Sequence, residues 1–195
     1  MNRKNPFKKY YDLSNIETSM DKFKNLPSFP RYIDIELTNS CNFSCLMCPT
    51  GNLSQKRKTG FMSDDVFEKV LVGIKPHLTP LRFIRWGEPT LHPNFVNYIQ
   101  KSHNLGILTH MNTNGSKLDD LYMENIINAG LNSIKFSFQG VDRKSYDEMR
   151  RIDFYDELIS TIKRFVDIRG DREYPFIQVS TSVTYENKDI IKRFR

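Results

Sequence analysis

The sequence predicts an α/β fold in which a parallel sheet curves into a partial (β/α) barrel. Strand-like segments alternate with helix-length segments along the chain, and parallel strands need connections of that length. Four of the five strand-like segments alternate apolar and polar residues, whereas a sheet covered by helices on both faces has almost continuous apolar strands. If helices cover only the apolar faces, the polar faces meet one another around an enclosed cavity.

The positions of the strands and helices follow from hydrophobic periodicity. We expect strands at 32–38, 81–86, 107–113, 133–139 and 176–184. We expect helices at 63–75, 94–103, 118–129 and 156–169, and a last helix at 187–195. The sequence therefore predicts five strand–helix units.

The polar residues of these strands should share one interior face. They include Asp34, Glu36, Lys135, Ser137 and Gln178. The strand at 81–86 fits this pattern poorly, because both of its faces mix arginine with apolar residues. An antiparallel sheet with one solvated face is the alternative, but it needs short hairpin links where this sequence has helix-length ones.

The chain is long enough for one domain with a buried core. It has 195 residues and a mass of 23.0 kDa. Residues 1–30 show no convincing period and are expected to form an N-terminal arm, while 31–195 form the core domain. No apolar run approaches the roughly 20 residues of a membrane span, and the N-terminus lacks the apolar centre of a signal peptide. We therefore expect a cytoplasmic protein with no membrane partner.

The charge of the chain is a weak argument for nucleic-acid binding. The net charge of +6 is distributed along the chain, and a diffuse excess of this kind is typical of a solvated surface. We therefore do not expect nucleic acid as a partner.

The three cysteines carry the chemical information. Cys41, Cys45 and Cys48 fall within eight residues at the end of the first predicted strand, so an odd and clustered set rules out a disulfide framework. Crowded thiolates bind a soft metal or an iron–sulfur cluster, and a structural zinc site needs a fourth ligand. Three thiolates on a four-iron cluster leave one iron open, which is typical of a catalytic cluster.

These residues resemble the radical S-adenosylmethionine (radical SAM) enzymes, whose cluster loop reads CxxxCx-aromatic-C. Later strand ends carry similar motifs: Trp86-Gly87-Glu88-Pro89 resembles Gly-Gly-Glu-Pro, Thr113-Asn114-Gly115 ends the third strand, and Ser137-Phe138-Gln139-Gly140 is similar to Ser-x-Asp-Gly. The resemblance runs from about residue 32 to the end. It is strongest to the branch that includes molybdenum-cofactor, heme-pathway and peptide-maturation (SPASM-type) enzymes.

The resemblance implies a [4Fe–4S] cluster on the three cysteines and S-adenosylmethionine beside it. Met47 stands where the family has an aromatic residue against the adenine, and it is polarizable enough to replace that contact. Glu88 would accept hydrogen bonds from the methionine amino group, and Gly87 would allow close backbone approach. Ser137 and Gln139 would bond ribose hydroxyls or the methionine carboxylate.

The resemblance implies two further cofactor contacts, and each has an alternative interpretation. Asn114 is either a cofactor contact or part of an ordinary Asn-Gly turn. Arg150 would pair with the methionine carboxylate in the bidentate manner that suits a guanidinium, although the neighbouring Arg151 competes for that position. His92 is better suited to a turn than to catalysis.

The implied activity is radical chemistry. A reduced cluster would cleave S-adenosylmethionine to a 5′-deoxyadenosyl radical, which would abstract hydrogen from an unknown small-molecule or peptide substrate, with an electron donor such as flavodoxin or ferredoxin. Two alternatives stay open: a metal-binding or electron-transfer module without S-adenosylmethionine, and a nucleic-acid-binding protein. The family core has six units, so we expect a C-terminally truncated core whose sixth unit is missing, which leaves the activity of this chain alone in question.

Overall fold

The computed structural model of the chain describes residues 3–15, 26–54 and 56–182. Its centre is one five-stranded sheet in the order β1-β2-β3-β4-β5, and each neighbouring pair is parallel. The strands are β1 (Ile33–Ile35), β2 (Leu81–Phe83), β3 (Thr109–Thr113), β4 (Ser133–Ser137) and β5 (Phe176–Ser180). All five lie inside the predicted ranges, so the parallel α/β prediction is confirmed and the antiparallel alternative is wrong.

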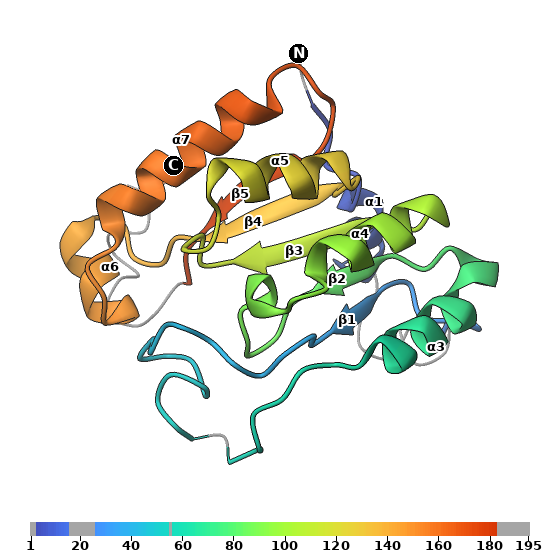
Figure 1. Cartoon of the computed structure of the whole chain (residues 1–195), viewed down its shortest axis with the longest axis horizontal. Coiled ribbons are helices and arrows are strands. Elements are labelled where there is room, and N and C mark those ends of the chain that lie inside the picture. The colour runs from blue at the N-terminus through green and yellow to red at the C-terminus, as the bar shows by residue number, and fades with distance from the viewer. Residues whose placement is uncertain (1–2, 16–25, 55, 183–195) are drawn as a thin grey trace.

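The four predicted helices between the strands are all present. They are α3 (Asp64–Ile74), α4 (Phe95–Asn104), α5 (Asp120–Asn128) and α7 (Tyr155–Arg169), with short 3-10 turns η1 (Lys75–His77) and η2 (Pro89–Leu91). Figure 1 shows α4, α5 and α7 on one side of the sheet. The helix predicted at 187–195 lies outside the described residues. None of the helices in the described part of the chain is long and apolar enough to cross a membrane.

Two helices in the described part of the chain were not predicted. The first, α1 (Lys8–Asn15), lies within 1–30, where we expected no regular element. The second, α6 (Arg143–Arg150), is almost entirely polar, so it has too few apolar residues to reveal its period. Its start is fixed by a capping box in which the Asp142 carboxylate accepts from the Ser145 N–H and the Ser145 hydroxyl accepts from the Asp142 N–H.

The register of the sheet sorts apolar and polar residues onto opposite faces. One row across the sheet holds the apolar residues Ile35, Phe83, Met111, Ile134 and Ile177. This row belongs to the core between the sheet and the helices. The row one residue earlier in each strand holds Asp34, Arg82, His110, Ser133 and Phe176. Successive side chains of a strand point to opposite faces, so the predicted polar face exists.

Two details of the predicted interior face differ. Glu36 lies beyond the end of β1, where its carboxylate pairs with Arg57 and accepts from the Trp86 N–H. The strand β2 ends at Phe83, three residues before the predicted end, and Arg85 has a φ of 137°. The mixed pattern at 84–86 therefore arises because these residues have left the sheet.

The N-terminal segment covers the polar face near the amino ends of the strands. The Phe7 side chain is fully buried, and its ring centroid lies 5.5 Å from that of His110. The Arg82 guanidinium lies over the ring of Tyr32, 4.1 Å from its centroid, and 5.6 Å from that of Tyr11. Figure 1 shows α1 on the side of the sheet opposite α4 and α5. The polar face is therefore covered near the amino ends of the strands, whereas its carboxyl end borders a cavity.

The buried imidazole of His110 predicts a specific pH dependence of stability. Burial lowers the pKa of His110 from 6.5 to about 4, although its bond to Asn112 partly offsets this. Below about pH 6.5 the unfolded chain binds a proton that the folded chain does not take up until about pH 4, so acid favours unfolding across this window.

We expect wild-type protein to lose more unfolding free energy across that window than His110→Gln, which cannot titrate. Urea unfolding of both proteins at several pH values measures the difference. If the unfolding free energies of the two proteins changed with pH by the same amount, His110 would not stay neutral in the fold.

Candidate functional site

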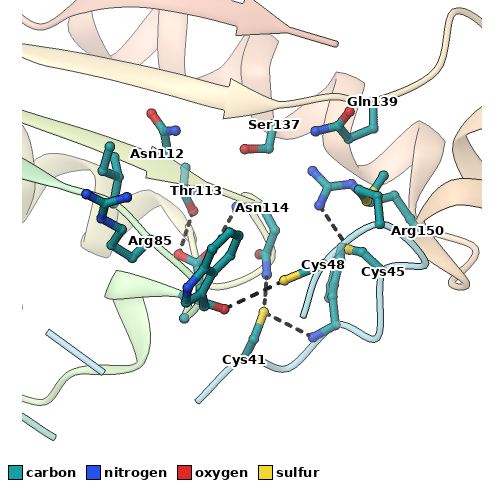
Figure 2. A pocket seen from close by; sticks show the side chains of 16 residues that line it. Cys41, Cys45, Cys48, Arg85, Asn112, Thr113, Asn114, Ser137, Gln139 and Arg150 are labelled. Atoms are coloured by element: carbon teal, nitrogen blue, oxygen red, sulfur yellow. Dashed lines mark hydrogen bonds between the residues drawn. The ribbon is translucent and has the colours of Figure 1, made fainter. Parts of the chain in front are cut away.

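A single cavity at the carboxyl end of the sheet contains all ten residues that the sequence singled out. They are Cys41, Cys45, Met47, Cys48, Gly87, Glu88, Asn114, Ser137, Gln139 and Arg150. The rest of its lining is formed by Phe43, Ile84, Arg85, Trp86, Asn112 and Thr113. Figure 2 shows these side chains converging from the ends of the strands and from the loop after β1. The carboxyl end of the strands is where parallel barrels place their active sites.

The three cysteines lie in the loop that follows β1, and all are free thiols. Cys45 is buried, and its sulfur accepts a hydrogen bond from Arg150 Nη1 at 3.1 Å. The Cys48 thiol donates to the carbonyl of Trp86 at 3.9 Å. Burial raises the pKa of the Cys41 thiol to about 11, and the nearby Glu88 carboxylate adds to the increase. A bound metal would deprotonate such a thiol outright.

This arrangement of thiols suits a cluster better than a single ion. In the part of the chain that the structure describes, no three His, Cys, Asp or Glu side chains are close enough to share one metal ion. The sulfur ligands of a single zinc ion all lie about 2.3 Å from one point. A four-iron cluster instead offers each thiolate its own iron atom. The donor set and its position on one cavity wall therefore fit an iron–sulfur cluster.

Gly87 is required for the cysteine loop to approach the end of β2. A Cβ atom on Gly87 would lie 1.9 Å from the carbonyl oxygen of Thr38, a distance that no side chain tolerates. The next residue, Glu88, donates its backbone N–H to the Ser40 carbonyl at 2.9 Å. We predicted a close backbone approach at Gly87, and the structure shows that its neighbour is the chain's own backbone just before Cys41.

Glu88 joins the ends of β2 and β3. Its side chain is 3% exposed. Its Oε1 accepts from the hydroxyls of Thr90 at 2.7 Å and Thr113 at 2.8 Å, while Oε2 accepts from the Asn114 N–H at 2.8 Å. Burial raises the pKa of Glu88, and these hydrogen bonds oppose the increase. A carboxylate oxygen has two acceptor positions, so Oε2 retains one for a ligand.

Asn114 fastens the cysteine loop to the end of β3. Its Nδ2 donates to Asn42 Oδ1 at 3.0 Å and lies 3.9 Å from the sulfur of Cys41, while its Oδ1 accepts from the Ser116 N–H. Asn42 in turn donates to the Ser116 hydroxyl at 2.7 Å. Asn114 is thus a turn residue that also faces the cavity. The sequence analysis missed Asn42, because its partners lie more than 70 residues away.

Arg150 brings an incompletely bonded guanidinium into the cavity. Its side chain is 6% exposed at the end of α6, and its guanidinium lies 5.8 Å from the Phe43 ring centroid. The Nε and Nη2 atoms are buried without a hydrogen-bond partner in the structure. Burying a charged group without partners is costly, so these atoms favour an anionic ligand. Arg151 is exposed and caps α6, so of these two arginines only Arg150 lines the cavity.

The other predicted residues border the same space. Ser137 ends β4, and Gln139 follows it with a φ of 59° and accepts from the Ser182 N–H through Oε1. Met47 is 37% exposed. His92 does not line the cavity: its Nδ1 accepts from the Asn94 N–H, which agrees with the expected turn role.

Comparison with known proteins gives consistent matches. The family model of the Radical SAM superfamily matches residues 35–194. A probable GTP 3',8-cyclase of Saccharolobus solfataricus is 28% identical over 137 residues, which are 69% of this chain and 43% of that protein. The AdoMet-dependent heme synthase of Methanosarcina barkeri is 24% identical over 167 residues, which are 85% of this chain and 46% of that protein.

Solved structures show the same fold. SuiB of Streptococcus suis, bound to S-adenosylmethionine, has a TM-score of 0.68 at 19% identity, covering 97% of this chain and 48% of that one. At this identity the likeness shows the fold alone, and it confirms the predicted barrel-type α/β architecture. The chain spans between 22% and 46% of the length of the two curated relatives named above and of three others that it matches.

The family match extends over well more than half of the chain, and the curated relatives include cofactor-pathway enzymes of the kind that the motifs resemble. The chain therefore belongs to the radical SAM superfamily of enzymes, whose cofactors are a [4Fe–4S] cluster and S-adenosylmethionine.

Proposed function

We propose that this chain forms the catalytic core of a radical SAM enzyme, with the cluster on Cys41, Cys45 and Cys48 and S-adenosylmethionine in the same cavity. The observation that carries the proposal is that the three thiols and residues of the three later strand-end motifs line one cavity. When bound, the reduced cluster and S-adenosylmethionine supply a 5′-deoxyadenosyl radical, which removes hydrogen from the substrate.

Two charged groups orient the methionine end of the cofactor. Oε2 of Glu88 accepts from the methionine ammonium through the position that Asn114 leaves open. Arg150 donates Nε and Nη2, which have no other partner, to the methionine carboxylate. An electron-transfer module without S-adenosylmethionine would have no anionic ligand for this buried and incompletely bonded guanidinium.

Polar and polarizable side chains bind the adenosine end. The Ser137 hydroxyl and Nε2 of Gln139 are available to ribose hydroxyls. Asn114, whose amide group bonds to Asn42 and Ser116, borders the same space. Met47 offers its thioether to the adenine ring. Because the amino end of the polar face is covered by Phe7 and its neighbours, the ligand itself closes the remaining opening and excludes water from the cavity.

The substrate is a small molecule or a peptide, and a protein such as flavodoxin or ferredoxin supplies the electron. The peptide class is supported by SuiB in complex with its precursor peptide SuiA, which has a TM-score of 0.68 to this chain at 21% identity. Small-molecule substrates are supported by the cyclase and heme synthase relatives.

The direct test is formation of 5′-deoxyadenosine. Anaerobically reconstituted protein should hold about four iron and four sulfide ions, and with dithionite it should convert S-adenosylmethionine to 5′-deoxyadenosine. Replacing Cys41, Cys45 and Cys48 together with Ala should remove both the iron and the product, whereas Lys163→Gln on exposed α7 should change neither. A triple variant that keeps its iron would place the cluster elsewhere.

Mutation should separate the role of Glu88 in cofactor binding from the role of the thiolates in iron binding. Losing the charge-assisted bond in Glu88→Ala should weaken S-adenosylmethionine binding roughly ten- to a hundredfold, with the iron retained. Thr113→Val removes one bond to Oε1, which costs about 1 kcal/mol of stability, but leaves Oε2 in place. Equal cofactor affinity in the two variants would reduce Glu88 to a structural link between strands.

Arg150 and Arg151 form a matched pair for the carboxylate contact. Arg150→Gln should weaken S-adenosylmethionine binding by roughly tenfold or more, because of these two guanidinium groups only that of Arg150 lines the cavity. Arg151→Gln should bind as the wild type does. Calorimetric titration of both variants on anaerobic protein gives the comparison, and similar losses in both would indicate a general charge effect.

A further inference from the structure

Lys135 lies on the polar face of the sheet without a partner for its charge. It is at the middle of β4, beside Asn112 of β3 and Gln178 of β5 in the register. Its side chain is partly buried, and within the described residues its ammonium makes no hydrogen bond or ion pair. Burial and the nearby Arg82 lower the pKa of Lys135. A partly buried ammonium with neither acceptor nor counter-ion favours an anionic ligand.

Arg85 adds a second positive charge at the cavity wall, and among the residues that the structure describes its only ion pair is shared with another arginine. The Asp34 carboxylate accepts two hydrogen bonds from Arg82, at 2.6 and 3.0 Å, and also lies 3.3 Å from Arg85. One carboxylate therefore serves two guanidinium groups. The Glu36 carboxylate is already paired with Arg57. In the described part of the chain, this side of the cavity thus carries an excess of positive charge.

Asn112 presents its amide nitrogen to the same side. Gln178 Nε2 donates to the Ser133 hydroxyl at 3.1 Å, and that hydroxyl lies 3.0 Å from His110 Nδ1. With Nδ1 accepting from Ser133, the proton of the neutral imidazole is on Nε2, which donates to Asn112 Oδ1 at 2.8 Å. The oxygen of Asn112 is thereby occupied, and its NH₂ group remains as a donor at the cavity wall.

The backbone at Arg85 supports a ligand-binding role for this wall. Its φ of 137° is rare for a residue with a side chain, and such strain is concentrated at functional sites. Figure 2 shows Arg85 and Asn112 on one side of the cavity and Arg150 on the other. The donors near Arg85 are therefore separate from the group that we assign to the methionine carboxylate.

We propose that Lys135, Asn112 and Arg85 bind an oxyanion group of the substrate, a carboxylate or a phosphate, on the inner face of β3 and β4. This rests on the proposed function, because the anion belongs to the molecule that shares the cavity with S-adenosylmethionine. Arg85 and Asn112 line the cavity, and Lys135 lies beside Asn112 in the register of the sheet. All three residues offer donors, two of them charged, which is the pattern that an oxyanion requires. The site selects anionic substrates over neutral ones of the same shape.

The test is titration of simple anions into reconstituted protein that is already saturated with S-adenosylmethionine. The probes are inorganic phosphate, the dicarboxylate malonate and the neutral malonamide, at constant ionic strength. We expect one of the two anions to bind and malonamide not to bind. The anion that binds identifies the substrate group as phosphate or carboxylate.

Variants assign the binding to these residues. Lys135→Gln and Arg85→Gln should each weaken anion binding by roughly tenfold or more. Lys163→Gln makes the same charge change on the exposed surface of α7 and should have no effect. Because the Lys135 ammonium has no partner among the residues that the structure describes, Lys135→Gln should also unfold at the same or a higher temperature than the wild type.

Several results would overturn the proposal. These are the absence of binding by either anion, equal weakening by Lys163→Gln, and a Lys135→Gln variant that is less stable but binds anions normally. Iron content and S-adenosylmethionine affinity are measured on the same samples. Wild-type protein that holds no iron and does not bind S-adenosylmethionine would contradict the proposed function. Wild-type protein that holds iron and binds S-adenosylmethionine but binds neither anion would contradict only this inference.

Discussion

The site depends on one buried carboxylate and the backbone beside it. Glu88 accepts hydrogen bonds from Thr90, Thr113 and Asn114, and its N–H bonds to Ser40 just before the cysteine loop. One residue thus fixes the end of β2, the end of β3 and the entry to the cluster loop. Leaving a buried donor unsatisfied costs about 1–3 kcal/mol. Separating the end of β2 from the end of β3 or from the cluster loop would therefore cost several unsatisfied hydrogen bonds.

The division of the sheet into two faces makes this cavity possible. The apolar row with Phe83 and Met111 is covered by helices, which leaves the polar row with Arg82 and His110 on the opposite side. The buried Phe7 closes that side near the amino ends of the strands. Charged and polar residues therefore line the space in which we propose that a cofactor and a substrate anion bind.

The sequence was informative wherever a signal was local. Each motif follows a predicted strand end closely in the sequence, so Cys41–Cys48, Gly87 and Ser137 could be placed on one edge once the strands were recognised as parallel. Contacts between distant segments could not be predicted: the clamp between Asn42 and Asn114 spans 72 residues. The helix α6 was not predicted because it is highly polar. The end of β2 was predicted too late in the sequence because Arg85 adopts an unusual φ.

The central claim is that the thiolate-bound cluster and S-adenosylmethionine occupy the same cavity. Electron paramagnetic resonance of the reduced cluster, recorded before and after addition of S-adenosylmethionine, measures this contact without requiring a substrate. We expect the cofactor to shift the spectrum, because the iron that lacks a cysteine ligand lies beside the groups that hold the methionine end. A spectrum that S-adenosylmethionine leaves unchanged, in protein with a full complement of iron, would contradict the claim and favour an electron-transfer cluster.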